Sequence, residues 1–285
     1  MNHIYTKSEL FSQLEALRMP RDRVVLMHSS LRLIGQIEGG ASALLDILID
    51  YFTAEGGLFC VPAHTWANLW ETDKEYTLDV CDMHTCLGAF SVLAVADGRG
   101  IRTENPTHSM VVFGQRDKAE AFAKGEIDTP SGTAPESCYG KIYEMGGFVL
   151  LVGVSHARNT YLHAVDEMMK LPNRITDTPT EVKIRRASGE VLTRRINTHH
   201  PSLTPDISAR FPKYETAFRY HGAITDGRLG DAPVQACDAR IMKEVMELIQ
   251  FRADRDPLSD EAALPPVWYV KNNLEILRIF DNLIC

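Results

Sequence analysis

The sequence predicts an α/β fold, and two parts of the chain carry that prediction. An apolar run at residues 23–27 leads through a polar turn into an amphipathic helix at 41–54, and a second apolar run follows at 58–61. Strand, helix and strand within about 40 residues are typical of a crossover unit. A continuous apolar run at 148–153 then leads into a helix predicted at 160–171. Such a run suits a strand that is buried on both faces.

The other predicted elements follow in order along the chain. Thr6 and Glu9 have the spacing of a capping box, which predicts a helix that ends at Met19-Pro20. Residues 181–186 and 191–196 alternate in polarity around a short turn, and they predict a hairpin. Further helices are predicted at 87–95, 117–124, 139–144, 213–220, 239–250 (capped by Asp238) and 272–283, with an apolar strand at the end of 101–114 and a long loop at 66–85.

Composition narrows the classes of function. The chain has 285 residues, 45% apolar and 24% charged, with a formal net charge of −8. These values are typical of a globular protein, and the negative charge disfavours nucleic acid or an anionic membrane as a partner. No early segment has the apolar centre of a signal peptide, and no run is long enough for a membrane helix. We therefore expect a cytoplasmic protein.

The six cysteines are scattered, which argues against a disulfide framework in a chain of this length. Cys81, His84 and Cys86 lie close together in CDMHTC. They would need a fourth ligand, and their spacing is not that of a zinc knuckle. We therefore expect buried thiols and no metal.

His163 and Asp166 form the first candidate for chemistry. With Asn159 as the predicted N-cap, His163 would lie near the end of the first helical turn and Asp166 on the same face. Pairs at this spacing are more often solvated surface pairs. This one follows a buried strand, where α/β enzymes place their ligands, so acid–base chemistry is the alternative.

The HSSL turn at residues 28–31 is the second candidate. It leaves a predicted strand with two hydroxyls and a row of unpaired backbone N–H groups, and Arg32 is close in sequence. Such a turn can hold a phosphate or a carbonyl oxygen, although Ser-Ser turns are also common helix caps. Ser131, Gly132 and Ser137 lack the strand–turn–helix context of a hydrolase nucleophile elbow.

Five stretches together resemble the antibiotic N-acetyltransferase family, the aminoglycoside 3-N-acetyltransferases, which are distinct from the GCN5-related acetyltransferases. They occur in family order and span most of the chain. The stretches are VVLMHSSLRLIGQIEGG (24–40), GGLFCVPAHTW (56–66), RTENPTHSMVVFG (102–114), LLVGVSHARNTYLHAVDE (150–167) and GRLGDAPVQACDAR (227–240).

The resemblance implies a single α/β domain over residues 1–285, with a central mixed sheet flanked by helices. It also implies a small antiparallel appendage at about 175–200 and a C-terminal helix at 268–285, which packs either on the body or on a second copy in a homodimer. The implied activity is acetyl transfer from acetyl-coenzyme A to an amine of an aminoglycoside-like acceptor, without metal, an activity associated with antibiotic resistance.

The resemblance also implies roles for residues. His163 matches the catalytic histidine of the family, and Asp166 stands where the family usually has Glu, with Glu167 beside it, so either acid could orient the imidazole. Asn105 stands where many relatives have a histidine, which leaves His108 as the imidazole there. The coenzyme A site is expected at His28, Ser29, Ser30, Leu31, Arg32, Gly35, Ser109, Met110 and Val111, and the acceptor site at His64, His108 and Glu167.

The chemistry requires a base and an oxyanion donor. An amine is mostly protonated at neutral pH, and His163 can remove a proton from it. Thr65, His64 or the backbone N–H groups of residues 29–31 could stabilise the tetrahedral oxygen. The acidic loop at 71–82, with Glu167 and Asp177, could receive a polycation or could be a solvated surface.

Two other functions fit the sequence. A metal-dependent hydrolase would use the histidines at positions 64, 84, 108, 156 and 163 with acidic partners. A non-catalytic relative that binds coenzyme A is the other, and the Asp at 166 and the Asn at 105 are the features that favour it.

Overall fold

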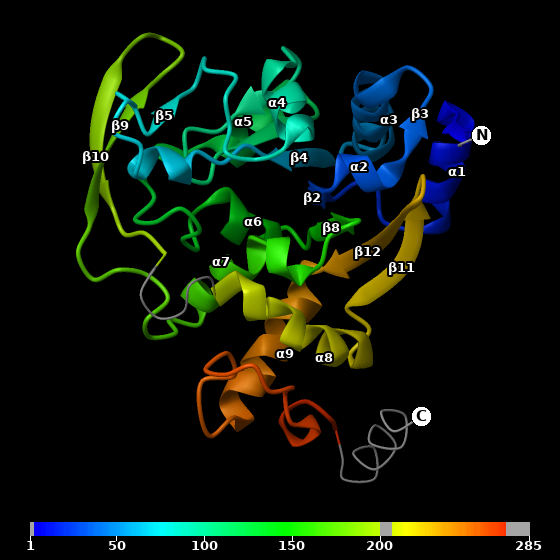
Figure 1. Cartoon of the computed structure of the whole chain (residues 1–285), viewed down its shortest axis with the longest axis vertical. Coiled ribbons are helices and arrows are strands. Elements are labelled where there is room, and N and C mark those ends of the chain that lie inside the picture. The colour runs from blue at the N-terminus through cyan, green and yellow to red at the C-terminus, as the bar shows by residue number, and fades with distance from the viewer. Residues whose placement is uncertain (1–2, 200–206, 272–285) are drawn as a thin grey trace.

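A computed structural model describes residues 3–199 and 207–271 of the chain. Its centre is a seven-stranded mixed sheet with the strand order β11-β12-β8-β2-β4-β7-β6 (Figure 1). The strands are β2 (Val24–Ser29), β4 (Leu58–Pro62), β6 (Ile101–Arg102), β7 (Met110–Phe113), β8 (Phe148–Val152), β11 (Ile224–Leu229) and β12 (Ala232–Asp238). This is the α/β fold with a central mixed sheet that the sequence predicts.

The three central strands β8, β2 and β4 are parallel, and antiparallel strands extend the sheet on both sides. Leu26 on β2 is paired with Cys60 on β4 and with Val149 on β8, and all three are fully buried. Apolar side chains on both faces of a strand are what a sheet covered by helices on both sides requires. The carboxyl ends of these strands meet at one edge, which is where such folds bind ligands.

Helices cover the two faces of the sheet and form two hydrophobic cores. One core joins the sheet to α1 (Lys7–Ala16), α3 (Gly40–Thr53) and α4 (Ala89–Ala96). The other joins it to α5 (Arg116–Ala123), α6 (Cys138–Glu144), α7 (Tyr161–Met168), α8 (Glu215–Tyr220) and α9 (Ala239–Arg252). Successive residues of β8 alternate between these two cores, since side chains of a strand point to opposite faces.

A smaller sheet lies at the edge of the molecule (Figure 1). The predicted hairpin is present as β9 (Thr180–Arg185) and β10 (Val191–Ile196), which are antiparallel. A short strand β5 (Leu78–Asp79) pairs in parallel with β9. The long loop predicted at 66–85 therefore contains a strand, and also a 3-10 turn η1 (Trp66–Leu69). A two-residue strand gives no periodicity that sequence could show.

Most predicted helices are confirmed. The capping box of α1 and the Asp238 cap of α9 both form. The cap predicted for α7 is wrong, because Thr160 occupies the N-cap and the Asn159 amide contacts His156 instead. Residues 207–214 form a 3-10 helix, η4, so only the second part of 213–220 is α-helical.

The stretch 227–240 gave no strand prediction, yet it carries most of β11 and β12. Two further short strands, β1 (Ile4–Tyr5) and β3 (Gln36–Ile37), pair with each other, and α2 (Leu31–Ile34) is a single turn. The helix predicted at 272–283 lies outside the described residues. Within those residues, no helix has the length and apolar character needed to cross a membrane.

Candidate active site

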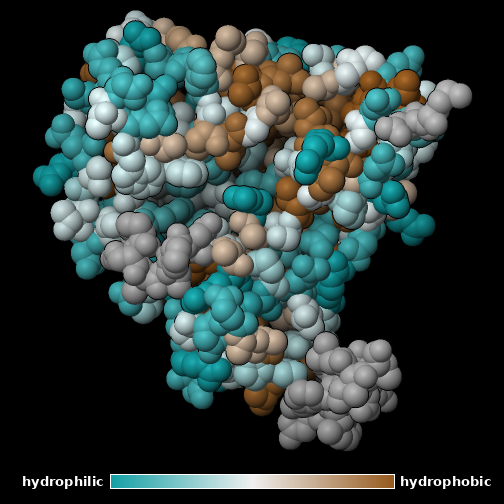
Figure 2. Space-filling model, in the orientation of Figure 1, coloured by the Kyte–Doolittle hydropathy of each residue, from teal (hydrophilic) through white to brown (hydrophobic). Residues whose placement is uncertain are grey.

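A cavity of about 610 Å³ opens where the carboxyl ends of the central parallel strands meet. His28 and Ser29 reach it from the end of β2, His64 from just beyond β4, and Val154 from just beyond β8. Part of its wall is aromatic and apolar, made by Leu31, Trp66, Leu69, Trp70, Leu87 and Phe90. On the face shown in Figure 2, hydrophobic residues gather over the region of α2 and α3.

Four imidazoles form a row along the wall of this cavity. The ring centroid of His163 lies 4.1 Å from that of His199, with the planes 19° apart. His199 lies 4.8 Å from His108, and His108 lies 4.7 Å from His64. The row ends at Tyr139, whose hydroxyl lies 2.7 Å from Nε2 of His64. Residues predicted in separate stretches therefore meet in one place.

Burial favours the neutral form of three of these rings. It lowers the pKa of His64, His108 and His163 well below the ordinary value of 6.5, and neighbouring imidazoles lower the pKa of each further. Desolvation disfavours the charged form of a base, which is the physical cause. A neutral imidazole has a lone pair that can accept a proton.

The local fold explains how His163 reaches the cavity. β8 ends at Val152, Gly153 follows with a positive φ of 64°, and the loop turns through η3 (His156–Arg158) into α7. His163 is therefore in the first turn of α7, as predicted, and it lines the cavity. Its ring packs between His199 and Phe211, the latter at 4.8 Å.

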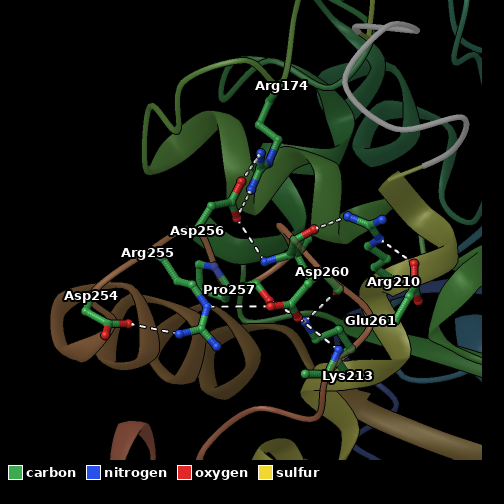
Figure 3. Close-up of polar contacts among 11 residues, drawn as sticks. Arg174, Arg210, Lys213, Asp254, Arg255, Asp256, Pro257, Asp260 and Glu261 are labelled. Atoms are coloured by element: carbon green, nitrogen blue, oxygen red, sulfur yellow. Dashed lines mark hydrogen bonds and ion pairs between the residues drawn. The ribbon is translucent and has the colours of Figure 1, made fainter.

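Asp166 does not contact His163 in this structure. Its Oδ2 accepts a hydrogen bond from Nε of Arg174 at 2.9 Å, and Arg174 also binds both oxygens of Asp256 (Figure 3). Asp166 is fully buried, and burial raises its pKa to about 7 although Arg174 opposes the shift. The three-residue spacing puts His163 and Asp166 on neighbouring parts of the helix, but the hydrogen-bond partner of Asp166 is Arg174.

Glu167 lies on the cavity side of α7 but is itself enclosed. Its two carboxylate oxygens accept hydrogen bonds from the hydroxyls of Ser131 and Thr133. The side chain is 7% exposed, and burial raises its pKa. Oxygens that already accept two protein donors are poorly placed to bind a substrate ammonium group, so the geometry does not favour the acceptor-binding role expected for Glu167.

The HSSL turn contributes part of what was expected. His28, Ser29 and Leu31 line the cavity, whereas Ser30, Arg32 and Gly35 are not among its lining residues. The N–H of Ser30 donates to the carbonyl of Val152 at 2.9 Å, which fixes the turn against β8. Nε2 of His28 is buried and has no hydrogen-bond partner among the described residues.

Four other residues that were expected at the site belong to the interior of the protein. Met110 and Val111 lie in β7 and are paired with β4, with at most 1% of either exposed. The Ser109 hydroxyl donates to the carbonyl of Ala63 at 2.6 Å, and the Thr65 hydroxyl donates to the carbonyl of Pro106 at 3.0 Å. None of the four lines the cavity. The apolar run beside the polar turn is a buried strand, and the hydroxyls satisfy carbonyls at its end.

Asn105 supports the loop that presents His108. Its Oδ1 accepts the backbone N–H groups of Thr107 and His108, and its Nδ2 donates to the carbonyl of Gly132 at 2.9 Å. The side chain is fully buried. An Asn at this position therefore has a structural role, and the imidazole in this part of the wall is that of His108.

Of the five histidines suggested for a metal-dependent hydrolase, His64, His108 and His163 line the cavity, and the other two do not. His84 is exposed and hydrogen-bonds Asp82, while His156 is buried against Phe218 on the other side of η3. Among residues 3–199 and 207–271, no group of three or more His, Cys, Asp or Glu side chains is arranged to hold a metal ion. Cys81 and Cys86 are both exposed, so the expectation of buried thiols in CDMHTC is wrong. Cys86 lines the cavity.

The sequence interpretation gave no role to several residues of the cavity wall. Trp66, Trp70, Phe90 and Arg158 line it, and so does His199, which comes from the end of the hairpin. Both tryptophans lie in the segment that was predicted as a long loop, 66–85. Nothing in the sequence indicated that a residue 36 positions after His163 would stack on it.

Comparison with known proteins identifies the family. The model of the aminoglycoside 3-N-acetyltransferase family matches residues 26–249. The chain belongs to this family.

Two relatives show how distant the similarity is. The chain is 28% identical over 172 residues to aminoglycoside N(3)-acetyltransferase IV of Salmonella sp., an alignment that covers 60% of this chain and 62% of that protein. It is 26% identical over 178 residues to the SPbeta prophage-derived aminoglycoside N(3')-acetyltransferase-like protein YokD of Bacillus subtilis, covering 56% and 64%. The matched part thus spans less than two thirds of either relative.

Solved structures of similar fold include family members with ligands. AAC-IIIb in a binary complex with CoASH has a TM-score of 0.72 at 21% identity, covering 90% of this chain and all of that one. AAC(3)-IVa as apoenzyme has a TM-score of 0.69 at 21% identity, covering 96% and 95%. AAC-VIa bound to sisomicin has a TM-score of 0.67 at 18% identity, covering 86% and 98%. At these identities the likeness shows a shared fold.

Proposed function

We propose that this protein transfers an acetyl group from acetyl-coenzyme A to an amine of an aminoglycoside-like acceptor, with His163 as the general base. The observation that carries this function is that His163 and the HSSL residues His28, Ser29 and Leu31 line one cavity. A base and a strand-end turn suited to an acyl or phosphate group are the two parts that the reaction needs.

The reaction makes a defined demand on His163. An amine attacks the thioester carbonyl only as the free base, and the attack releases a proton from nitrogen. Burial lowers the pKa of His163, so the ring is neutral at pH 7 and can accept that proton directly or through water. The thioester becomes an amide, and the thiolate of coenzyme A leaves.

Asp166 takes a different place in this scheme from the one expected. Because its carboxylate pairs with Arg174, we assign it to holding α7 in position. His28 offers a polar atom for the thioester oxygen, since Nε2 lacks a protein partner among the described residues and the ring lines the cavity. It would donate a hydrogen bond in the tautomer that carries the proton on Nε2.

The acceptor class rests on the family and on named relatives. The Salmonella relative is an aminoglycoside acetyltransferase by name, and solved structures of similar fold hold a gentamicin, apramycin or sisomicin. Three carboxylates of the acidic loop already have partners: Glu71 pairs with Lys74, Asp79 with Arg185 and Asp82 with His84. A cationic acceptor would therefore meet the other acids of that loop.

A thiol-release assay tests this function. Acetyl-coenzyme A is supplied with gentamicin, apramycin, sisomicin and simple amino sugars, and release of free thiol is followed for the wild type and for His163→Ala. We expect His163→Ala to lower kcat by about 10²- to 10⁴-fold, the usual contribution of a general base. His84→Ala is the matched control, because that ring is exposed and is not among the residues that line the cavity.

Two results would reject the proposed function in different ways. A His163→Ala enzyme as active as the His84→Ala control would show that the base is another group. Tight binding of coenzyme A without transfer to any amine would indicate the non-catalytic relative.

A further inference from the structure

The two stacked imidazoles of the cavity have unlike surroundings. His163 and His199 come from α7 and from the segment that follows β10, and their planes are nearly parallel at 4.1 Å. Two rings this close cannot both be protonated without strong repulsion. Whatever neighbours favour charge on one ring therefore keep the other neutral.

A hydroxyl and a carboxylate lie behind His199. The Thr133 hydroxyl donates to Oε1 of Glu167 at 2.6 Å, and the hydroxyl oxygen lies 2.9 Å from Nε2 of His199. A hydroxyl has one proton, and an ionised carboxylate can only accept. With that proton directed at Glu167, Thr133 accepts the N–H of His199, so Nε2 is the protonated nitrogen and Nδ1 is the one that exchanges a proton.

Glu167 is held as a charge partner of His199. The Ser131 hydroxyl donates to its other oxygen, and Oε1 lies 4.0 Å from Nε2 of His199. A carboxylate at this distance stabilises an imidazolium, more strongly in a partly buried site than in water. Among the described residues, the imidazoles of His163, His108 and His64 also act on His199.

His163 has no such support. The charged or titratable groups that act on it are His199, Arg174 and His64, and each of them disfavours a positive charge on the ring. Two titratable groups whose surroundings drive them in opposite directions are the usual arrangement of an acid and a base in one site.

We propose that His199 is a second catalytic residue, the general acid that protonates the thiolate of coenzyme A, with Thr133 and Glu167 as its positioning residues. This assignment rests on the proposed acetyl transfer, in which His163 is the base. It gives Glu167 a role that its enclosed carboxylate can fill, in place of contact with the acceptor.

The proposed steps balance. The bond from nitrogen to the acetyl carbon forms as His163 takes one proton from nitrogen. The bond from carbon to sulfur breaks in the same concerted step, and the electron pair stays on sulfur. Nδ1 of His199 gives sulfur its proton as His163 takes the proton from nitrogen, so the two rings are never both charged. Solvent returns the proton from His163 to His199, so the sum is amine plus acetyl thioester giving amide plus thiol.

Histidine titration by NMR tests the pair without turnover. The protein is labelled with ¹⁵N-histidine, and the two rings are assigned with His163→Gln and His199→Gln. We expect His199 to carry its proton on Nε2 when neutral and to titrate at higher pH than His163. Glu167→Gln should move the titration of His199 to lower pH, because it removes the carboxylate and keeps the shape.

Kinetics test the role in turnover. We expect His199→Gln to lower kcat by about 10²-fold, the lower end for acid–base catalysis, because a thiolate is already a good leaving group. The decline of kcat at high pH, where the acid loses its proton, should disappear in that variant. Thr133→Val should make the decline of kcat at high pH less pronounced. Thr133→Ser, which keeps the hydroxyl, should show the same decline as the wild type.

The outcomes separate the two proposals. A His163 that titrates above His199, or a His199 titration unmoved by Glu167→Gln, would overturn the acid–base pair even in an active enzyme. So would a His199→Gln enzyme with an unchanged pH profile. A wild type that transfers acetyl to no amine would overturn the proposed function and the acid role together.

Discussion

The four imidazoles of the cavity wall differ in their hydrogen bonding because their neighbours differ. His64 is tied to Tyr139, His108 is presented by the Asn105 loop, and His199 has a carboxylate behind Thr133. His163 has a stacked ring on one side and Phe211 on another. Burial favours the neutral form of His64, His108 and His163. The hydrogen-bonding groups around each ring therefore decide which one can carry charge.

The pH dependence of kcat follows from the state of His163. Its pKa lies below 6.5, so the neutral ring persists as pH falls and is lost only when pH passes that lowered pKa. We expect the acidic limb of kcat, measured at saturating acetyl-coenzyme A and acceptor, to lie below pH 6.5. An acidic limb above 6.5 would show that the base is stabilised as a cation, contrary to the surroundings of His163.

Ion pairs fix the position of α7 and of the connector after α9. Arg174, just beyond α7, binds Asp166 within the helix. Figure 3 shows its other contact, with Asp256 in the connector, and the pairs of Lys213 with Asp260 and of Arg210 with Glu261 that join η4 to the connector. The Arg174 side chain is 5% exposed. A buried guanidinium that joins two segments holds the helix that carries His163, although it never touches the cavity.

Removing Arg174 should destabilise the protein in a pH-dependent way. Arg174→Met leaves Asp166 buried without its cation, a change that costs about 3–5 kcal/mol when the carboxyl must ionise. The pKa of Asp166 is already raised to about 7, and loss of Arg174 raises it further, so the deficit grows as pH rises from 5 to 8. Urea denaturation at both pH values measures the free energy of unfolding.

Arg255→Met is the control for this substitution. Arg255 is half-exposed and pairs with Asp254 and Asp260 at 3.4 and 3.6 Å, so its loss should cost less than about 1 kcal/mol. Equal losses for the two variants would show that burial of the Arg174 pair contributes nothing.

The start of α9 depends on a side-chain cap. Oδ1 of Asp238 accepts the backbone N–H groups of Arg240 and Ile241. Asp238→Ala should lower the free energy of unfolding by about 1 kcal/mol, because it leaves two donors unsatisfied. Gln115 occupies the N-cap of α5 without a side-chain bond, so Gln115→Ala should change little. Thermal unfolding of both variants measures the change in melting temperature. A similar change for the two variants would contradict a stabilising cap at Asp238.

At the scale of the whole molecule, the chain has a net charge of −8. A field of this sign attracts a polycationic acceptor and is screened by salt over about 10 Å at 0.1 M ionic strength. We expect kcat/KM for an aminoglycoside to fall several-fold between low and high salt. kcat/KM for a neutral amine acceptor should stay nearly constant, and a parallel fall for both would point to salt acting on the coenzyme instead.

Much of the fold could be predicted because its signals are local. A few neighbouring residues are enough to recognise the capping box of α1, the buried apolar runs of β2, β4 and β8, and the hairpin. β11 and β12 could not be predicted, because a glycine- and proline-containing stretch gives weak periodicity and pairs only once β8 provides an edge.

The site could be predicted where residues follow strand ends. His28, Ser29 and His64 lie at such ends, His163 lies in the helix that follows β8, and all four line the cavity. His199 and the partner of Asp166 could not be predicted, since stacking and ion pairing join segments whose separation in sequence carries no signal. Ser109, Met110 and Val111 show the opposite error, because a polar turn beside an apolar run does not say which of its residues face the cavity.

The tryptophans give this molecule an optical reporter of its own site. The chain has three, and two of them, Trp66 and Trp70, line the cavity with their rings edge to face at 5.8 Å. The third, Trp268, is buried beneath the guanidinium of Arg255, which lies 5.2 Å from its ring. Two of the three tryptophans therefore lie on the cavity wall, and a ligand that enters should change the intensity of intrinsic fluorescence whether or not acetyl is transferred.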